Sequence, residues 1–188
     1  MRISISPARR ADADTIAFAV GKGALTGLPI TASKTVIEGA KAARFTGETA
    51  AIFETFVDEG GKTIRVMLVG IGAGNGADFE KAGAALVAKL LTSGAAALNV
   101  EFPGGANGDY VARLAFGLQL RGWRMDAYRT RLSDKQKPTL QDVTLVSDAS
   151  GAREAWERLS AVADGVLFAR ELVAEPANIL YPESFVER

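Results

Sequence analysis

The amino-acid sequence predicts an α/β fold in which helices pack against a layered sheet. Two patterns indicate it: short apolar runs of strand length, and longer stretches in which apolar residues recur every three or four positions. Because the two patterns alternate along the chain, a sheet covered by helices is the expected arrangement. The length of 188 residues suits one domain, or one domain followed by a short additional segment.

The first part of the chain predicts two strands and a short helix. Ile3 and Ile5 alternate with polar residues, which is typical of a short strand, and the apolar run 15–20 predicts a buried strand. The Gly-Lys-Gly segment at 21–23 should end this second strand. Residues 31–43 predict the short helix.

The middle of the chain predicts two strands joined by a turn, and then a helix. Residues 50–56 and 63–70 have strand composition, and the Asp-Glu-Gly-Gly segment at 58–61 predicts the turn between them. The near-continuous apolar run of 63–70 predicts a central strand that is covered on both faces. Asp78 is suited to cap the following helix, whose predicted buried face consists of Phe79, Ala82, Leu86 and Leu90.

The next part predicts two further strands and one further helix. Residues 95–102 and 143–146 predict the strands, and the charged segment 129–139 predicts a surface loop. Between the two strands, a glycine-rich loop at 103–109 leads into a helix with apolar positions at Val111, Leu114, Ala115 and Leu118.

A long final helix is predicted to end at a proline. Asp148 or Ser150 is suited to cap its start. Pro176 lacks an amide hydrogen and disfavours helical geometry at Glu175, so the helix should end there. Pro182 suits the first turn of a second helix. The long helix carries one stripe at helical spacing, formed by Trp156, Leu159, Ala163, Val166 and Val173, with Arg170 as its only polar member.

The composition excludes several kinds of chemistry. The chain contains no cysteine and no histidine, which removes disulfides, thiolate zinc sites and any mechanism that depends on an imidazole. Lys plus Arg and Asp plus Glu both number 22, so the formal charge of zero gives no reason to expect nucleic acid or an anionic membrane as a partner. The N-terminus shows no apolar run of signal-peptide length and no segment approaches the ~20 apolar residues of a membrane span, so we expect a cytoplasmic protein.

A glycine motif at 70–77 lies between the predicted strand 63–70 and the next helix. Gly72, Gly74 and Ala77 fit the Gly-x-Gly-x-x-Gly/Ala spacing with which dinucleotide folds bind a pyrophosphate, and Glu101 lies where a ribose-binding acid is expected. The same glycines also form tight turns between a strand and a helix. A dinucleotide fold usually carries the motif on the first strand of its unit, and its position here therefore favours the structural turn.

The C-terminal run 170–183, Arg-Glu-Leu-Val-Ala-Glu-Pro-Ala-Asn-Ile-Leu-Tyr-Pro-Glu, resembles the junction between the N-terminal and catalytic domains of the two-metal leucyl aminopeptidases, also called cytosol aminopeptidases. Ala174 stands where the family usually has Asn. Residues 117–130 resemble a second family segment, in which Met125 replaces the usual Phe. The junction residues that carry the first resemblance are Arg170, Glu175, Pro176, Asn178 and Pro182.

This resemblance implies the division of the chain and its role. Residues 1–175 would form a three-layer mixed sheet flanked by helices, similar to the macro domain, and residues 176–188 would form the junction and the start of a truncated helix. In such enzymes the whole protein removes N-terminal amino acids, often leucine, from peptides. The catalytic domain uses two divalent metal ions, zinc or manganese, and the proteins usually assemble as hexamers. We therefore expect a scaffold and assembly role for this chain.

The family pattern places no catalytic, cofactor-binding or metal-binding residue in this chain. Its Asn-Thr-Asp-Ala-Glu-Gly-Arg signature is absent from these residues. Lys22 lies in a Gly-Lys-Gly as the family's metal ligand does, but no Asp follows it nearby and the family's lysine lies beyond the junction. We interpret Lys22 as a loop lysine and expect the 188-residue fragment alone to be inactive.

Two other functions stay open at this point. A macro-like or dinucleotide-binding module would use the loops 70–77 or 103–109 for a nucleotide. Some aminopeptidases of this family also bind DNA; the balanced charge makes nucleic acid an unfavoured partner, although a basic patch is conceivable at Arg121, Arg124, Arg129, Arg131, Lys135 and Lys137.

Overall fold

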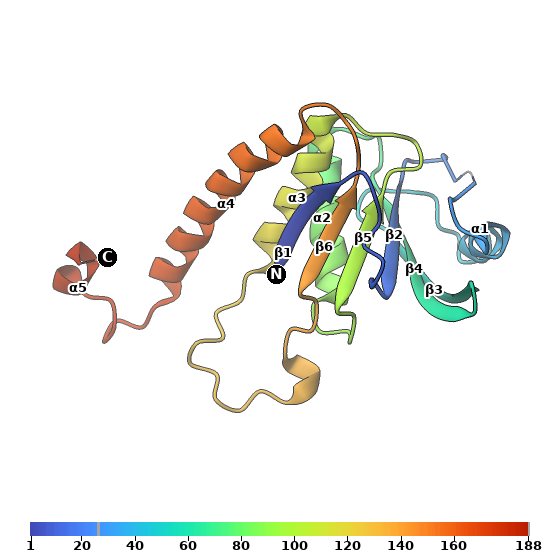
Figure 1. Cartoon of the computed structure of the whole chain (residues 1–188). Coiled ribbons are helices and arrows are strands. Elements are labelled where there is room, and N and C mark those ends of the chain that lie inside the picture. Colours follow the sequence, from blue (N-terminus) through green and yellow to red (C-terminus); the bar gives the residue numbers. More distant parts are fainter. Residues whose placement is uncertain (26, 188) are drawn as a thin grey trace.

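The computed structural model describes residues 1–25 and 27–187, in which a six-stranded sheet carries helices on both faces (Figure 1). The strands are β1 (Arg2–Ser6), β2 (Thr15–Val20), β3 (Ile52–Glu59), β4 (Lys62–Gly70), β5 (Ala97–Glu101) and β6 (Asp142–Val146). The helices are α1 (Ser33–Ala42), α2 (Gly76–Leu90), α3 (Gly108–Gly122), the short 3₁₀ helix η1 (Asp134–Gln136), α4 (Ala152–Ala174) and α5 (Pro182–Val186).

The sheet is mostly parallel, with the strand order β1-β6-β5-β2-β4-β3. All neighbouring strands pair in parallel except β3 and β4, which form an antiparallel hairpin. Gly60 and Gly61 form the hairpin turn with φ values of 63° and 82°, a left-handed backbone that favours glycine. The carboxyl ends of the five parallel strands therefore meet at one edge of the sheet, where the loops of an α/β fold can form a site.

Two apolar cores lie on opposite faces of the sheet. On one face, Met67 and Val69 of β4 pack in a core with residues of α2 and α3, such as Leu86 and Leu114. On the other face, Leu68 of β4 packs in a core with α1. The predicted three-layer mixed sheet flanked by helices is thus confirmed, as is the prediction that the strand of residues 63–70 is covered on both faces.

The helices α2 and α3 pack against each other at two glycines. A Cβ atom on Gly117 would lie 1.9 Å from the carbonyl oxygen of Glu80 in α2, and one on Gly83 would lie 2.1 Å from that of Leu114 in α3. These distances leave no room for a side chain, so the two glycines set how closely the helices approach.

Two predicted helix caps are wrong. The N-cap of α2 is Asn75, whose side chain accepts a hydrogen bond from the Asp78 amide, while Asp78 itself lies in the first turn. Neither Asp148 nor Ser150 caps α4. Its N-cap is Gly151 in the left-handed region at φ 75°, with no side-chain cap. In both cases the helix begins at a different residue from the one predicted. Several neighbouring residues are suited to the N-cap position, and the sequence alone does not choose between them.

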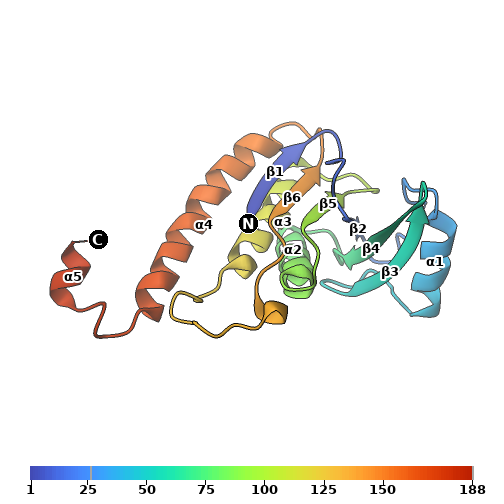
Figure 2. The ribbon, with the colours of Figure 1, turned by 60° about the horizontal axis from the view of Figure 1, so that its bottom comes forward.

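The long helix α4 lies against α3 along its first half and diverges from it toward its C-terminal end (Figure 2). Ala155 and Ala163 are buried in the first half. Val173, which helical spacing places on the same stripe, is 88% exposed. The last turns of α4 extend beyond the layer of α2 and α3, so helical spacing alone does not bury them. No helix within the described residues has the length and hydrophobicity that crossing a membrane requires.

Candidate functional site

The C-terminal segment that resembles the family's junction follows the end of α4 at Ala174. Glu175 is extended, with φ −66° and ψ 138°, and Pro176 follows it, so the predicted helix end is confirmed. Asn178 lies in the next turn, which is closed by two amides that donate to the Pro176 carbonyl at 2.9 Å. Pro182 occupies the first turn of α5, as predicted.

Two side chains tie the end of α4 to the end of α3 and to the segment that follows it. The Arg170 guanidinium donates a hydrogen bond of 2.6 Å from Nη1 to the Leu120 carbonyl and lies 6.0 Å from the centroid of the Trp123 ring. The Tyr128 hydroxyl donates to the Glu175 carboxylate. These contacts explain why Arg170, the polar member of the apolar stripe, points toward α3: its donors reach carbonyl oxygen at the end of that helix.

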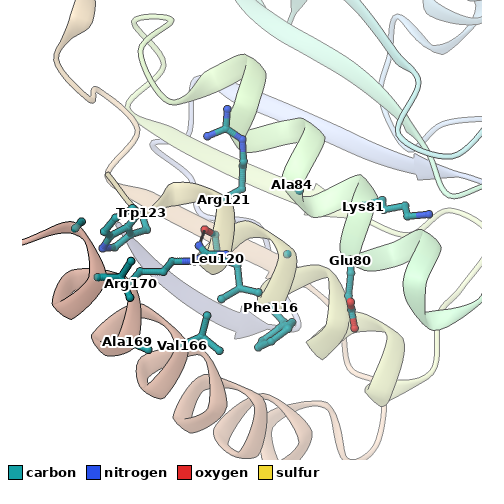
Figure 3. A pocket seen from close by; sticks show the side chains of 13 residues that line it. Glu80, Lys81, Ala84, Phe116, Leu120, Arg121, Trp123, Val166, Ala169 and Arg170 are labelled. Atoms are coloured by element: carbon teal, nitrogen blue, oxygen red, sulfur yellow. Dashed lines mark hydrogen bonds between the residues drawn. The ribbon is translucent and has the colours of Figure 1, made fainter. Parts of the chain in front are cut away.

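An open groove of about 920 Å³ lies between the C-terminal half of α4 and the outer faces of α2 and α3 (Figure 3). Most of its lining is apolar. Phe116, Leu120 and Trp123 contribute from the side of α3, and Val166 and Ala169 from α4. The sequence pattern missed this groove because its walls come from three separate helices. The only sequence signal was an arginine within the apolar stripe of α4.

The two glycine loops considered for nucleotide binding meet at the carboxyl edge of the sheet. Residues of both loops line one small cavity of about 360 Å³, together with Phe79 and Tyr110. These two rings stack with centroids 5.1 Å apart, and Phe79 is only 2% exposed. The loops therefore close over aromatic packing between α2 and α3.

The N-terminus of α2 already carries a carboxylate. Asp78 is 9% exposed and accepts a hydrogen bond of 2.7 Å from the Thr49 hydroxyl and one of 2.8 Å from the Asn75 amide group. The Thr49 bond, followed by backbone amides that include Asn75, lowers the pKa of Asp78 and keeps it ionised at neutral pH. A pyrophosphate at this helix end would meet a negative charge of the same sign, so this geometry favours a structural turn over the dinucleotide site.

Glu101 and Lys22, two other residues considered for chemistry, are both paired. Arg9 donates from Nε and Nη2 to the carboxylate of Glu101, which is 8% exposed. Lys22 lies 2.8 Å from Glu48, and their hydrogen bond raises the lysine pKa. Each charged group is therefore paired with a neighbouring residue, Glu101 with Arg9 and Lys22 with Glu48. These pairs give both residues a structural role.

The basic residues of the 121–137 segment are partly neutralised by neighbouring acids. Arg124 and Arg129 both face Asp126, at 2.6 Å and 3.7 Å, and Lys137 faces Asp134 at 2.9 Å. Salt bridges of this kind weaken the positive potential that would attract nucleic acid. Across positions 1–25 and 27–187, the acidic side chains form no group of three or more that could hold a metal ion.

The comparisons with known proteins decide the family. The model of the N-terminal domain of the cytosol aminopeptidase family matches residues 20–132. The chain belongs to the cytosol aminopeptidase family.

Curated relatives of this cytosol aminopeptidase domain are much longer. A probable cytosol aminopeptidase of Afipia carboxidovorans is 37% identical over 165 residues, which cover 85% of this chain and 33% of that protein. One of Caulobacter vibrioides is 39% identical over 149 residues, which cover 77% of this chain and 30% of that protein. The chain thus spans about a third of the length of these relatives.

Solved structures show the same fold. A mutant of tomato leucine aminopeptidase aligns with a TM-score of 0.76 at 19% identity, covering 99% of this chain and 41% of that one. The bottromycin maturation enzyme BotP in complex with Mn aligns with a TM-score of 0.73 at 23% identity, covering 94% of this chain and 35% of that one. These alignments extend over nearly the whole of this cytosol aminopeptidase domain.

Proposed function

We propose that the chain is the non-catalytic N-terminal domain of a metal-dependent leucyl aminopeptidase that removes N-terminal amino acids from peptides. The observation that carries the proposal is the match to the family's N-terminal domain, in a chain that spans a third of the length of its relatives. The remaining two thirds of such a protein would contain the catalytic machinery. In the division that we propose, residues 1–175 are the domain and 176–188 the interdomain junction.

In this proposal the two metal ions, zinc or manganese, belong to the catalytic portion. The acidic side chains of the described residues form no group of three or more that could hold such ions, which supports placing the metal chemistry in the catalytic portion. The structure of BotP, which has a similar fold, is a complex with Mn, and this supports the proposal that the full-length protein depends on a metal ion. The full-length protein would act on peptides in the cytoplasm and assemble as a hexamer.

The contribution of this domain would be structural. Arg170 ties the end of α4 to Leu120 in the last turn of α3, and Glu175 ties it to Tyr128, which follows α3. These contacts would fix the direction in which the chain leaves the domain. A rigid exit positions the catalytic portion relative to this domain. The scaffold would thereby support assembly and shape access to the active site.

We expect the full-length protein to hydrolyse leucine-p-nitroanilide in the presence of manganese, and the 188-residue chain to release no p-nitroaniline above the uncatalysed rate. Absorbance of p-nitroaniline measures both, and chelation by EDTA should abolish the activity of the full-length protein. Metal-dependent turnover by the 188-residue chain would contradict the non-catalytic role, and an inactive full-length protein would contradict the peptidase assignment.

The alternative, a macro-like or dinucleotide-binding module that uses the Gly70–Ala77 loop, gains no support from the geometry of that loop. The Asp78 carboxylate lies at the helix end that a phosphate would need, and Glu101 is paired with Arg9. We therefore put the scaffold role first.

A further inference from the structure

We propose that the groove between α4 and the α2/α3 face is the docking site for the catalytic portion of the same polypeptide, the segment that would follow position 188. This inference rests on the proposed function and names the surface through which the domain would support its partner. The occupant is an apolar element of that segment, lying in the groove with its side chains against α3.

The first support is the distribution of exposed apolar side chains. Most of the large apolar residues that are exposed among the described residues lie between positions 162 and 186. Val173, which lines the groove, is 88% exposed, and Val186 in α5 is 84% exposed. Most of the groove lining is apolar, and apolar surface gathered in this way is typical of an interaction site rather than of a solvated face.

The second support is that the groove is preformed. Arg170 reaches across from α4 to the Leu120 carbonyl, while Phe116 and Trp123 line the side of α3 (Figure 3). The buried alanines of the first half of α4 let it pack closely on α3, and the second half diverges. An apolar groove beside helices can accept an apolar helix or strand without rearrangement.

The third support is the path of the chain, which selects the occupant. Val173 and Ala174, in the last turn of α4, line the groove, and residues 175–187 lead away from that same turn. Relatives of this chain are about three times as long, so a large part of the same polypeptide would follow α5, which residues 175–181 connect to the last turn of α4 beside the groove. A segment tethered to the domain has an effective concentration on the order of 1 mM at the groove. A free partner or a second copy of the chain has no such advantage.

Cysteine accessibility in the full-length protein tests the docking. The 188 residues contain no natural cysteine, so Val173→Cys and the matched control Val162→Cys each add a single thiol to this domain. Both residues lie on α4, and Val162, 55% exposed, is not part of the groove. We expect the Val173→Cys thiol to react with a maleimide at least about tenfold more slowly than the control, as read by peptide mass spectrometry. Equal or faster labelling, as the 88% exposure of Val173 in an open groove would give, overturns the inference.

Photo-crosslinking from position 173 identifies the occupant. With p-benzoylphenylalanine at this position in the full-length protein, cross-links to peptides beyond position 188 of the same chain support the proposal. A cross-linked dimer on a denaturing gel assigns the groove to a second copy and overturns it, as does the absence of any protein cross-link. Peptidase activity of the unmodified full-length protein distinguishes a failure of the proposed function from a failure of the docking proposal. An inactive protein refutes the proposed function. An active protein whose Val173→Cys thiol is labelled as fast as the control refutes the docking alone.

Discussion

Replacing Gly117 with alanine is expected to lower the free energy of unfolding by about 3 kcal/mol, at the upper end of the usual cost of overpacking. The new Cβ would lie 1.9 Å from the carbonyl oxygen of Glu80 and 2.8 Å from its carbonyl carbon. Both atoms belong to the backbone of α2, so no side-chain rotation relieves the clash. The helices must separate, and the packing of Leu86 and Leu114 in the core beneath them is loosened. Urea unfolding of the variant and the unsubstituted chain measures the difference.

Gly165→Ala in α4 is the matched control for this substitution. It is also a helical glycine, but a Cβ added there meets no heavy atom within 4 Å. Alanine should therefore stabilise the helix, by about 0.5–1 kcal/mol, because it restricts the unfolded chain more than glycine does. A Gly117→Ala variant as stable as the unsubstituted chain would show that α2 and α3 do not approach as closely as described.

Replacing Arg9 with methionine is expected to cost about 3 kcal/mol, the low end of the range for breaking a buried ion pair. Glu101 is 8% exposed, and Arg9 donates two hydrogen bonds to its carboxylate and one of 2.7 Å to the Pro29 carbonyl. The Arg9 side chain is itself 33% exposed, which is why the low end applies. Without it the carboxylate is left in the protein interior with no counter-charge. Chemical denaturation at neutral pH measures the loss.

The double variant Arg9→Met/Glu101→Met separates the lost ion pair from lost packing. Removing both charges should recover most of the stability that the single variant loses, because no buried charge then remains unpaired. A single variant that costs less than about 0.5 kcal/mol would mean that Glu101 does not depend on Arg9, and would return this carboxylate to the candidates for ligand binding.

Local patterns predicted the sheet and its covering helices well, because each pattern reports burial directly. The apolar run of residues 63–70 can be buried on both faces only in a covered strand, and β4 has that position. The caps were harder to predict, since Asn75 and Asp78 are both good capping residues and only the backbone path chooses between them. Val173 is exposed although helical spacing places it on the apolar stripe of α4. Spacing gives the direction in which a side chain points, but not how far along the helix its packing partner extends.

The end of α4 and the start of α5 could be predicted from sequence because prolines act locally. Pro176 and Pro182 determine a helix end and a helix start almost alone, and the structure has both. The glycine motif shows the opposite case. Its spacing fits a phosphate site, but the contact of Asp78 with Thr49, which is 29 positions away, argues against one. The groove also depends on contacts distant in sequence, such as Arg170 with Leu120, and no single stretch of sequence indicates it.

The most direct measurement of the central claim is the reading frame of the gene beyond codon 188. If the chain is the N-terminal domain of a two-metal aminopeptidase, the frame should continue for about twice the length of this chain, as in its relatives. It should encode a lysine and several carboxylates as metal ligands, together with an arginine in the Asn-Thr-Asp-Ala-Glu-Gly-Arg signature. A frame that terminates at codon 188, or that continues without such ligands, would contradict the assignment.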